Sequence, residues 1–388
     1  MHYDIIVIGG GISGIITAIA LAKEGLKIAL VELKSIETLT SLQDDGRVFA
    51  ISQGSWQILS KYGLSDILAP KAGLIEHIRV CDDNSLLHLD FFNDVVDNLP
   101  LGYMLEHNNF VKEMYNIAIS QKNITIYDGN AYDNIEFFPN HASVKIKEQV
   151  ITADLIIGAD GKNSKIRTLA NIETSSWGYN QTAMVCNVTH EQNHQNIAIE
   201  KFMPNGPLAI LPMAGGMTSS IVWIEKSELA SIYLKMEPEE FLYYLQERFT
   251  DYLGPIKIVN NIYSYELSCK YAKKFYSHRL ALIADAAHSI HPIAGQGLNL
   301  GISDIDCLVE NIKSYRLNGL DIGGRIMLEK YHKKRFSAVM VMVAATDGIN
   351  RLFVNNLAII KIARRVGMAS INKFGWLKKK ITKYAMGD

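Results

Sequence analysis

The N-terminal segment constrains the fold most strongly, because it combines a buried strand, a glycine-rich turn and a helix in one short stretch. The β-branched run Asp4–Ile8 is typical of a strand that is buried on both faces. It leads into Gly9-Gly10-Gly11-Ile12-Ser13-Gly14, which has the spacing G-x-G-x-x-G. Ile15–Glu24 then predicts a helix that Gly25 ends, and Lys27–Val31 predicts a second strand. This order is that of a Rossmann-like βαβ unit and predicts an α/β fold.

The glycines of this unit have separate physical roles in binding a dinucleotide. Gly9 permits the tight turn, Gly11 lets the backbone approach a pyrophosphate, and Gly14 lets the helix and the strand pack closely. The N-terminus of the helix offers unpaired N–H groups and a positive dipole end to the phosphates. Glu32 follows the second strand, where its carboxylate can accept hydrogen bonds from ribose hydroxyls and would repel a ribose 2′-phosphate. The unit predicts a dinucleotide site but does not separate NAD from FAD.

A second stretch, residues 153–167, has a buried strand, the turn Asp160-Gly161 and the start of a helix. Asn163 and Ser164 can cap that helix. An ordinary strand-to-helix corner explains this pattern as well as a binding loop does, so both interpretations stay open.

A third stretch, residues 279–309, predicts a buried strand that ends on Asp285, a glycine-rich loop and the start of a helix. Such a loop presents N–H donors to an anionic ring edge or a phosphate. Asp285 at the strand end can meet a ribityl or ribose hydroxyl. His288 and His291 have no third ligand at a suitable spacing, so no metal site is predicted.

The three blocks, in this order and at these separations, resemble the flavoprotein aromatic hydroxylases of the para-hydroxybenzoate-hydroxylase type. His291–Asp304 matches every fixed position of the signature of the ubiquinone-biosynthesis monooxygenase family. Asp44–Ser52 resembles the arginine-containing segment of that family, and Gly206–Pro212 with Ser220–Trp223 resembles its substrate-domain strands. The resemblance therefore covers nearly the whole chain.

The resemblance assigns residues to parts of an FAD cofactor. Those that would hold the adenosine half are Gly9, Gly11, Gly14 and Glu32. Those that would line the isoalloxazine are Gly295, Gln296, Gly297, Leu298 and Asn299. Arg47 would contact the cofactor near the phosphates or the entrance, and Asp160 and Gly161 would serve both FAD and the reduced nicotinamide. Asp285 would bind the ribityl chain, and Pro292 would shape the wall that faces the substrate.

The same resemblance implies a function. The chain would be an FAD-dependent monooxygenase that hydroxylates the aromatic ring of a polyprenyl phenol in ubiquinone biosynthesis, with NADH or NADPH, O2 and a flavin C4a-hydroperoxide. Because the cofactor carries the oxygen chemistry, no catalytic side chain is assigned. The alternatives are a hydroxylase of a soluble aromatic, a flavin-dependent isoprenoid reductase, and a silent scaffold. Only Ala284 favours the scaffold, since the family usually has glycine there.

The predicted domains are not continuous in sequence. Short alternating apolar segments predict an inserted antiparallel sheet for the substrate, and Pro238–Phe249 predicts an amphipathic helix on it. The chain is predicted to end in a helical tail, with one helix over Arg325–Thr346. The predicted parts are an FAD-binding domain (residues 1–70, 101–175 and 265–325), a substrate domain (71–100 and 176–264) and a helical, basic, amphipathic C-terminal segment (326–388).

Charge is concentrated at the C-terminus. The 388 residues carry a net charge of −1, which gives no overall attraction to nucleic acid, yet residues 348–388 hold nine basic residues and one acidic residue. Mixed with apolar residues, they predict either an interfacial helix pair on anionic lipid or a solvated face of a helical cap. The longest apolar run, Val339–Ala345, is far short of the roughly 20 residues of a spanning helix. We expect a cytoplasmic protein that is peripheral to the inner membrane, with other ubiquinone-biosynthesis enzymes as further candidate partners.

Overall fold

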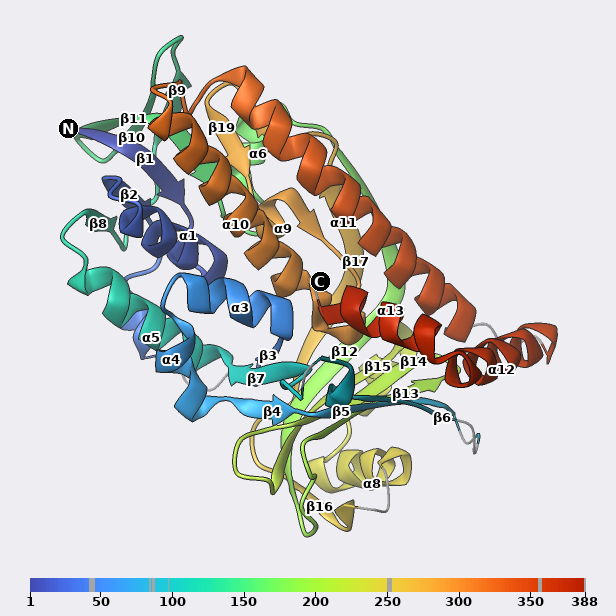
Figure 1. Cartoon of the computed structure of the whole chain (residues 1–388). Coiled ribbons are helices and arrows are strands. Elements are labelled where there is room, and N and C mark those ends of the chain that lie inside the picture. The colour runs from blue at the N-terminus through green and yellow to red at the C-terminus, as the bar shows by residue number, and fades with distance from the viewer. Residues whose placement is uncertain are drawn as a thin grey trace.

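The computed structural model describes residues 1–41, 46–83, 85, 88–96, 98–249, 253–354 and 358–386. Asp44 and Asp45 of the predicted arginine-containing segment lie outside these residues. The chain builds one mainly parallel sheet with helices, a second large sheet beside it, and a C-terminal run of helices that passes from the first sheet to the second (Figure 1).

The first sheet has the order β18-β19-β11-β1-β2-β8, and its last five strands run parallel. Ile5, Ile6 and Val7 of β1 are fully buried, as the β-branched run predicts for a central parallel strand. A hairpin of β9 and β10 extends β11. The strands are β1 (His2–Ile8), β2 (Ile28–Val31), β8 (Ile124–Tyr127), β9 (Asn134–Phe137), β10 (Ala142–Ile146), β11 (Gln149–Gly158), β18 (Tyr276–Ser277) and β19 (Leu280–Leu282).

The second sheet has the order β20-β17-β12-β15-β14-β13-β5-β6, with β16 against β12. It is antiparallel, as predicted, except that β5 runs parallel to β13. Parallel pairing is possible because β5 arrives from an earlier part of the chain and not through a hairpin. The strands are β5 (His77–Asp82), β6 (His88–Phe92), β12 (Thr174–His190), β13 (Ile197–Met203), β14 (Gly206–Pro212), β15 (Thr218–Lys226), β16 (Ile256–Ile258), β17 (Tyr263–Ala272) and β20 (His288–Ser289).

A small sheet of β3 (Val48–Ser52), β7 (Gly102–Glu106) and β4 (Gly73–Ile75) joins the two large ones. Its apolar residues form one cluster with one face of the second sheet, while the other face of that sheet packs on α8. The helices and helical turns that precede the C-terminal run include α1 (Ile12–Lys23), α2 (Ile36–Thr40), α3 (Gln53–Lys61), α4 (Ser65–Leu68), α5 (His107–Ser120), α6 (Lys165–Leu169), α7 (Ser227–Tyr233), α8 (Pro238–Arg248), α9 (Ala284–Ala287) and α10 (Gln296–Leu317).

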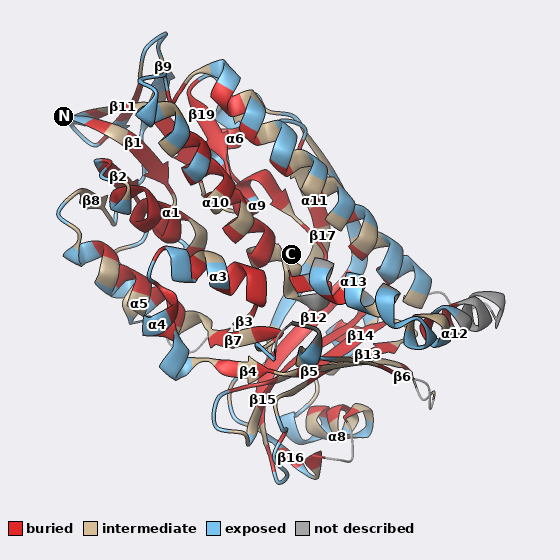
Figure 2. Cartoon of the chain, viewed as in Figure 1, coloured by how far each residue is buried: buried red, intermediate tan, exposed pale blue. Residues whose placement is uncertain are grey.

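The C-terminal run consists of α11 (Arg325–Val354), α12 (Ala358–Lys373) and α13 (Gly375–Met386). The first helix does not end at Thr346 as predicted, because residues 347–354 continue it onto the second sheet, where Phe353 stacks on Phe202 of β13 at 3.8 Å between ring centroids. By length and composition α11 is long and apolar enough to cross a membrane. Figure 2 shows exposed residues along its outward side. That the chain does not cross a membrane stays a prediction.

Candidate functional site

Four adjacent parallel strands end at the same edge of the first sheet, and each is followed by a residue predicted to bind the cofactor. Gly9 follows β1, Glu32 follows β2, Asp160 lies just after β11, and Asp285 lies just after β19. In sheets of this kind, ligands bind outside the carboxyl ends of the strands. The three sequence blocks therefore converge on one edge and not on separate parts of the molecule.

The loops also touch one another. A Cβ atom added to Gly9 would lie 2.5 Å from the Ala159 carbonyl oxygen, so the first and second loops are in backbone contact. A Cβ atom added to Gly301 of α10 would lie 2.8 Å from Ala284 Cβ of the same block and 3.4 Å from Ser13 Oγ of the first block. Glycine is thus needed at position 9 for the close approach of the first two loops, and at position 301 for the packing of α10 against Ala284.

A different reason explains why glycine occupies position 11 of the first loop. Gly11 has an ordinary φ of −63°, and a Cβ atom added to it would meet no protein atom within 4 Å. Gly9, in contrast, has a φ of +102°, which favours glycine. Neither the backbone nor the packing explains Gly11, whereas a ligand lying close to the loop would.

Glu32 stabilises the first loop directly. Its Oε2 accepts the N–H of Gly10 at 2.6 Å, and its Oε1 accepts the N–H of Lys34 at 2.9 Å. Tyr115 of α5 donates its hydroxyl to the Gly10 carbonyl at 2.9 Å. The half-buried carboxylate of Glu32 lies beside the glycine loop, where it can also meet ribose hydroxyls.

The second loop forms a capped strand-to-helix corner, one of the two interpretations that the sequence left open. Asp160 Oδ2 accepts the N–H of Lys165 at 2.7 Å and so helps to cap α6, while its Oδ1 is buried without a hydrogen-bond partner in the part of the chain that the structure describes. Ser164 Oγ accepts the N–H of Arg167 at 3.0 Å, which confirms Ser164 as a cap. Gly161 has a φ of +79° and open space around it. The unpaired oxygen of Asp160 leaves an acceptor for a ligand.

Arg167 links the second loop to the third, a role that the sequence did not predict. Its buried guanidinium donates to the Ala286 carbonyl at 2.7 Å and to the Lys162 carbonyl at 2.9 Å. No local pattern marks Arg167 in the sequence, because it stands beside Lys165 and Thr168 in an ordinary mixed helix start. Fixing two strand ends together keeps the edge of the sheet rigid.

Asp285 begins the short helix α9 at the end of β19. Its side chain is exposed to solvent, yet the surrounding protein desolvates the carboxyl and raises its pKa. Nearby Lys162 and His288 favour the charged form and oppose this rise. A carboxylate that is accessible but enclosed in this way lies in a recess, as expected of a group that binds hydroxyls of a ligand.

The residue before it, Ala284, has a φ of +49°, in the left-handed region where glycine is favoured. Its N–H donates to Asp304 Oδ2 at 3.0 Å. The departure from glycine noted in the sequence is therefore a strained backbone position, and the hydrogen bond to Asp304 holds it in place.

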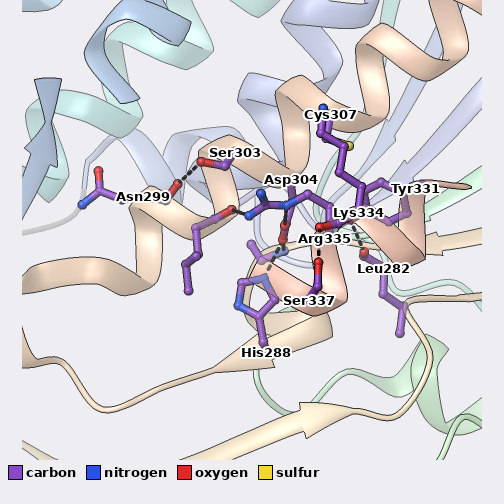
Figure 3. A network of polar contacts seen from close by, with 12 residues as sticks. Leu282, His288, Asn299, Ser303, Asp304, Cys307, Tyr331, Lys334, Arg335 and Ser337 are labelled. Carbon is purple, nitrogen blue, oxygen red and sulfur yellow. Dashed lines mark hydrogen bonds and ion pairs between the residues drawn. The ribbon is translucent and has the colours of Figure 1, made fainter. Parts of the chain in front are cut away.

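Asp304 organises a buried polar network beneath the third loop (Figure 3). His288 Nε2 donates to Asp304 Oδ2 at 2.6 Å, and Arg335 Nε of α11 donates to Asp304 Oδ1 at 2.6 Å. Burial favours the neutral acid, but the charges and hydrogen bonds of His288 and Arg335 outweigh it and lower the pKa of Asp304. The network ties α9, α10 and α11 together.

The loop between Pro292 and α10 is held against β3. Asn299 Nδ2 donates to the Ala50 carbonyl at 2.9 Å and to the Gly295 carbonyl at 3.0 Å, and its Oδ1 accepts the N–H of Ser52 at 2.9 Å. Gly295 has a φ of +63°, and a Cβ atom there would lie 3.0 Å from Ala50 Cβ. The side-chain amide of Asn299 thus positions the loop against β3.

The remaining predicted residues of this loop are half-buried: Pro292, Gln296, Gly297 and Leu298. Gly297 resembles Gly11, because a Cβ atom added to it would meet nothing within 4 Å. Arg47 lies farther along the small sheet, with Nη2 at 3.2 Å from both ring nitrogens of His107. The structure therefore places Arg47 just before β3, next to the residue that follows β7.

His291 closes the loop toward the second sheet. It is fully buried, burial lowers its pKa to about 4, and Asp347 opposes that shift. Its Nε2 lies 3.2 Å from Gln181 Oε1, which also accepts from Asn350 Nδ2 at 3.0 Å. Gln181 and Asn350 were not predicted, because only the fold brings β12 and α11 to this loop. Within the described ranges, no group of three or more His, Cys, Asp or Glu side chains is placed to hold a metal ion.

These features fit FAD. The open glycines at 11 and 297, the unpaired Asp160 oxygen and the enclosed Asp285 carboxylate lie along the ends of neighbouring strands and the helix that follows them. Helix α1 begins at the first loop and α10 at the third, so two helix N-termini with their positive dipole ends lie at this edge.

The fold and the site at the carboxyl ends of the parallel strands define a flavin-binding protein. The chain belongs to the family described as FAD binding domain, whose model matches residues 2–346. Its cofactor is therefore FAD, as predicted.

Among known proteins, the chain is similar to ubiquinone hydroxylase UbiL of Rhodospirillum rubrum, with 36% identity over 99% of this chain and 89% of the relative. It is 28% identical to 3-demethoxyubiquinol 3-hydroxylase of Escherichia coli, over 99% of this chain and 98% of the relative. The solved structure of p-nitrophenol 4-monooxygenase PnpA from Pseudomonas putida superposes with a TM-score of 0.82 at 18% identity, over 99% of this chain and 98% of that one. The first two likenesses confirm the resemblance seen in the sequence, and the third confirms the fold.

Proposed function

We propose that this chain is an FAD-dependent monooxygenase that hydroxylates the aromatic ring of a polyprenyl phenol in ubiquinone biosynthesis. The observation that carries the proposal is the meeting of four strand ends at one edge of the parallel sheet, beside an apolar face of the second sheet. The similarity to a ubiquinone hydroxylase and to a demethoxyubiquinol hydroxylase supports the reaction and the substrate class.

When bound, FAD supplies the oxygen-transfer chemistry, with NADH or NADPH as electron donor and O2 as oxidant. The protein binds FAD and the phenol, orients the two and excludes water from the site. The apolar cluster between the small sheet and the second sheet would hold the aromatic ring and the prenyl chain; its buried members are Ile75, Leu101, Met104, Ala198, Met213 and Met386. Pro292 would border this cluster on the side of the third loop.

The cofactor contacts predicted from sequence are part of the proposal. Gly9, Gly11, Gly14 and Glu32 would hold the adenosine half, and Arg47 would contact the cofactor near the phosphates or the entrance. Asp160 and Gly161 would serve both FAD and the reduced nicotinamide, and Asp285 would bind the ribityl chain. Gly295, Gln296, Gly297, Leu298 and Asn299 would line the isoalloxazine. We also propose the predicted division into an FAD-binding domain, a substrate domain and a C-terminal segment.

Purified enzyme reconstituted with FAD tests the function. With NADH or NADPH, air and a short-chain prenyl phenol, O2 uptake should be matched by a product that is heavier by one oxygen atom. Turnover without O2 would instead indicate an isoprenoid reductase. Hydroxylation of unprenylated phenols alone would indicate a soluble substrate, and a chain that takes up no FAD would indicate a scaffold.

Gly11→Ala sharpens this test. The added methyl has room in the protein but would stand where the pyrophosphate is proposed to lie, so folding should be unchanged and FAD affinity should fall by at least about tenfold. Gly348→Ala is a matched control, because Gly348 is exposed on α11 and its Cβ would also meet nothing within 4 Å. FAD retention after desalting measures the difference.

We propose further that the C-terminal segment attaches the cytoplasmic enzyme to the surface of the inner membrane. Phe374 and Trp376 are 48% and 69% exposed, and the neighbouring exposed lysines are Lys373, Lys379, Lys380 and Lys383. Aromatic and basic side chains together suit the headgroup layer. Two basic residues of the segment are engaged with acids instead, since Arg364 pairs with Asp82 and Arg351 with Asp347.

Co-sedimentation with vesicles tests the attachment. Reversing Lys379 and Lys380 to glutamate should weaken binding to anionic vesicles by at least about tenfold, at roughly 1 kcal/mol for each charge near the surface. Reversing Lys235 and Lys257, which are exposed near α7 and on β16, is the matched control. Equal binding of both double variants would contradict the proposal.

A further inference from the structure

Glu200 lies in the middle of β13, on the face of the second sheet that the small sheet and the C-terminal helices cover. Side chains alternate along a strand, so Ala198 and Phe202 share its face. Ala198 belongs to the apolar cluster with Met104 and Met386, and Phe202 stacks on Phe353 of α11. Ile199, on the other face, belongs instead to the cluster that packs on α8.

This face continues to the cofactor edge through β3. Ala50 of β3 packs against the same apolar cluster, its carbonyl accepts from Asn299, and its Cβ lies 3.0 Å from where a Cβ of Gly295 would be. The wall that carries Glu200 is therefore continuous with the loop proposed to line the isoalloxazine. In the second sheet, Glu200 is flanked by Val80 of β5 and by Ala209 of β14, which has a small side chain.

The carboxylate of Glu200 has no hydrogen-bond or ion-pair partner among the described residues, although it is partly accessible to solvent. Desolvation by the surrounding protein raises its pKa to about 7. An unpaired carboxylate on an interior strand destabilises a fold, and such groups concentrate at functional sites.

The charged groups around it do not account for this shift. Asp82 lies on the same face but pairs with Arg364 of α12, and Asp347 of α11 pairs with Arg351. The register places the charged side chains of neighbouring strands on the opposite face, and these are Arg79, His88, Asp90 and Lys201. Of the lysines of α13, Lys378 lies over the rings of Phe91 and Phe92 of β6.

We infer that Glu200 is the acceptor for the ring hydroxyl of the phenolic substrate: it binds the phenol through this hydroxyl and removes its proton as the ring is hydroxylated. This inference rests on the proposed function. In the step, the phenol O–H bond breaks, its proton passes to the Glu200 carboxylate, its electron pair forms a C=O bond, and a ring electron pair forms the new C–O bond while an O–O bond of the oxidant breaks. The ring carbon then loses its C–H proton to solvent, and the carbonyl oxygen takes back the proton held on Glu200, which restores the aromatic ring. The second oxygen atom of O2 leaves as water. The oxidant and the reductant are the O2 and NAD(P)H of the proposed reaction. General bases placed in this way contribute roughly 10²- to 10⁴-fold to rate.

Binding without turnover provides the first test. Holoenzyme without NAD(P)H is titrated with a short-chain prenyl phenol and with its O-methyl ether, across pH values on both sides of about 7, and the flavin absorbance is followed. The ionised carboxylate accepts the phenol hydroxyl more strongly than the neutral acid does, so phenol affinity should rise by at least about tenfold as pH increases. Affinity for the ether, which has no proton to donate, should not follow this profile.

Three variants separate the outcomes. Glu200→Gln should lose the pH dependence of phenol binding and at least about 10²-fold in the rate of hydroxylation, while it keeps FAD and oxidises NAD(P)H without hydroxylating. Glu200→Asp should restore part of the pH profile, and Glu266→Gln, on an exposed residue of β17, should behave as wild type. A Glu200→Gln enzyme with an unchanged phenol profile and rate would overturn the inference. A wild-type holoenzyme that never hydroxylates phenols would instead overturn the proposed function.

Discussion

Two carboxylates in the interior, Asp304 and Glu200, show how differently one chain treats the same chemical group. Asp304 is fully buried and receives hydrogen bonds from Ala284, His288 and Arg335, and these partners hold its pKa low. Glu200 is also surrounded by protein but has no partner among the described residues, and its pKa is raised to about 7.

The difference lies in what each carboxylate stabilises. Around Asp304, the partners come from the loop, from α9 and from α11, so the ion-pair network fixes the third strand end beneath the cofactor edge. Glu200, on the covered face of the second sheet, has no such partner among the described residues, so its carboxylate is a reactive group beside an apolar surface. A buried carboxylate with partners builds structure, and one without them is available for chemistry.

The largest expected effect is on the network. Asp304→Ala leaves the buried guanidinium of Arg335 without its carboxylate, which should lower the free energy of unfolding by about 3–5 kcal/mol. Glu310→Ala is the control, because the exposed Glu310 pairs with the half-exposed Lys61 and such pairs contribute about 1 kcal/mol or less. Urea denaturation followed by circular dichroism measures both. Equal losses would show that the two carboxylates do not differ as proposed.

The second largest effect concerns the way in which Glu200 makes the stability of the fold depend on pH. The pKa of Glu200 is raised from about 4.5 in the unfolded chain to about 7 in the fold. Its contribution to the free energy of unfolding is therefore most favourable below about pH 4.5 and is lost as the pH rises through about 7. Glu200→Gln should therefore be more stable than wild type above about pH 7, by up to about 3 kcal/mol, and the gain should vanish in acid. Denaturation midpoints of the wild type and of Glu200→Gln, measured across this pH range, test the prediction. If the two midpoints change with pH in parallel, Glu200 has a partner in solution.

The smallest effect concerns the strained residue that Asp304 holds. Ala284→Gly relieves a left-handed backbone position and should stabilise the protein by up to about 1 kcal/mol, since part of the gain is offset by the greater freedom of glycine in the unfolded chain. Combined with Asp304→Ala, the gain should shrink, because the hydrogen bond that holds the strained N–H is gone. Thermal unfolding of the wild type, the two single variants and the double variant forms a double-mutant cycle. Strictly additive effects would show that the strain at Ala284 is independent of the network.

Much of the cofactor half could be predicted from the sequence. The glycine spacing, the β-branched strands and the acids at strand ends are local patterns, and the fold places Gly9, Glu32, Asp160 and Asp285 at one edge as those patterns imply. Local patterns did not reveal that Asn299 is used to hold β3, that Arg167 joins two loops, or that β5 pairs parallel with β13. Each of these depends on a partner far away in the chain.

Short local patterns are enough to establish the α/β class and the position of the dinucleotide loop, because glycine conformations and strand burial depend on neighbouring residues. Which interior groups have partners depends instead on how distant segments pack together. The wall around Glu200 is assembled from residues as distant as Ala50 and Met386, and the network of Asp304 needs Arg335 from another helix. Whether a buried charge is satisfied depends on three-dimensional surroundings, which no short stretch of sequence contains.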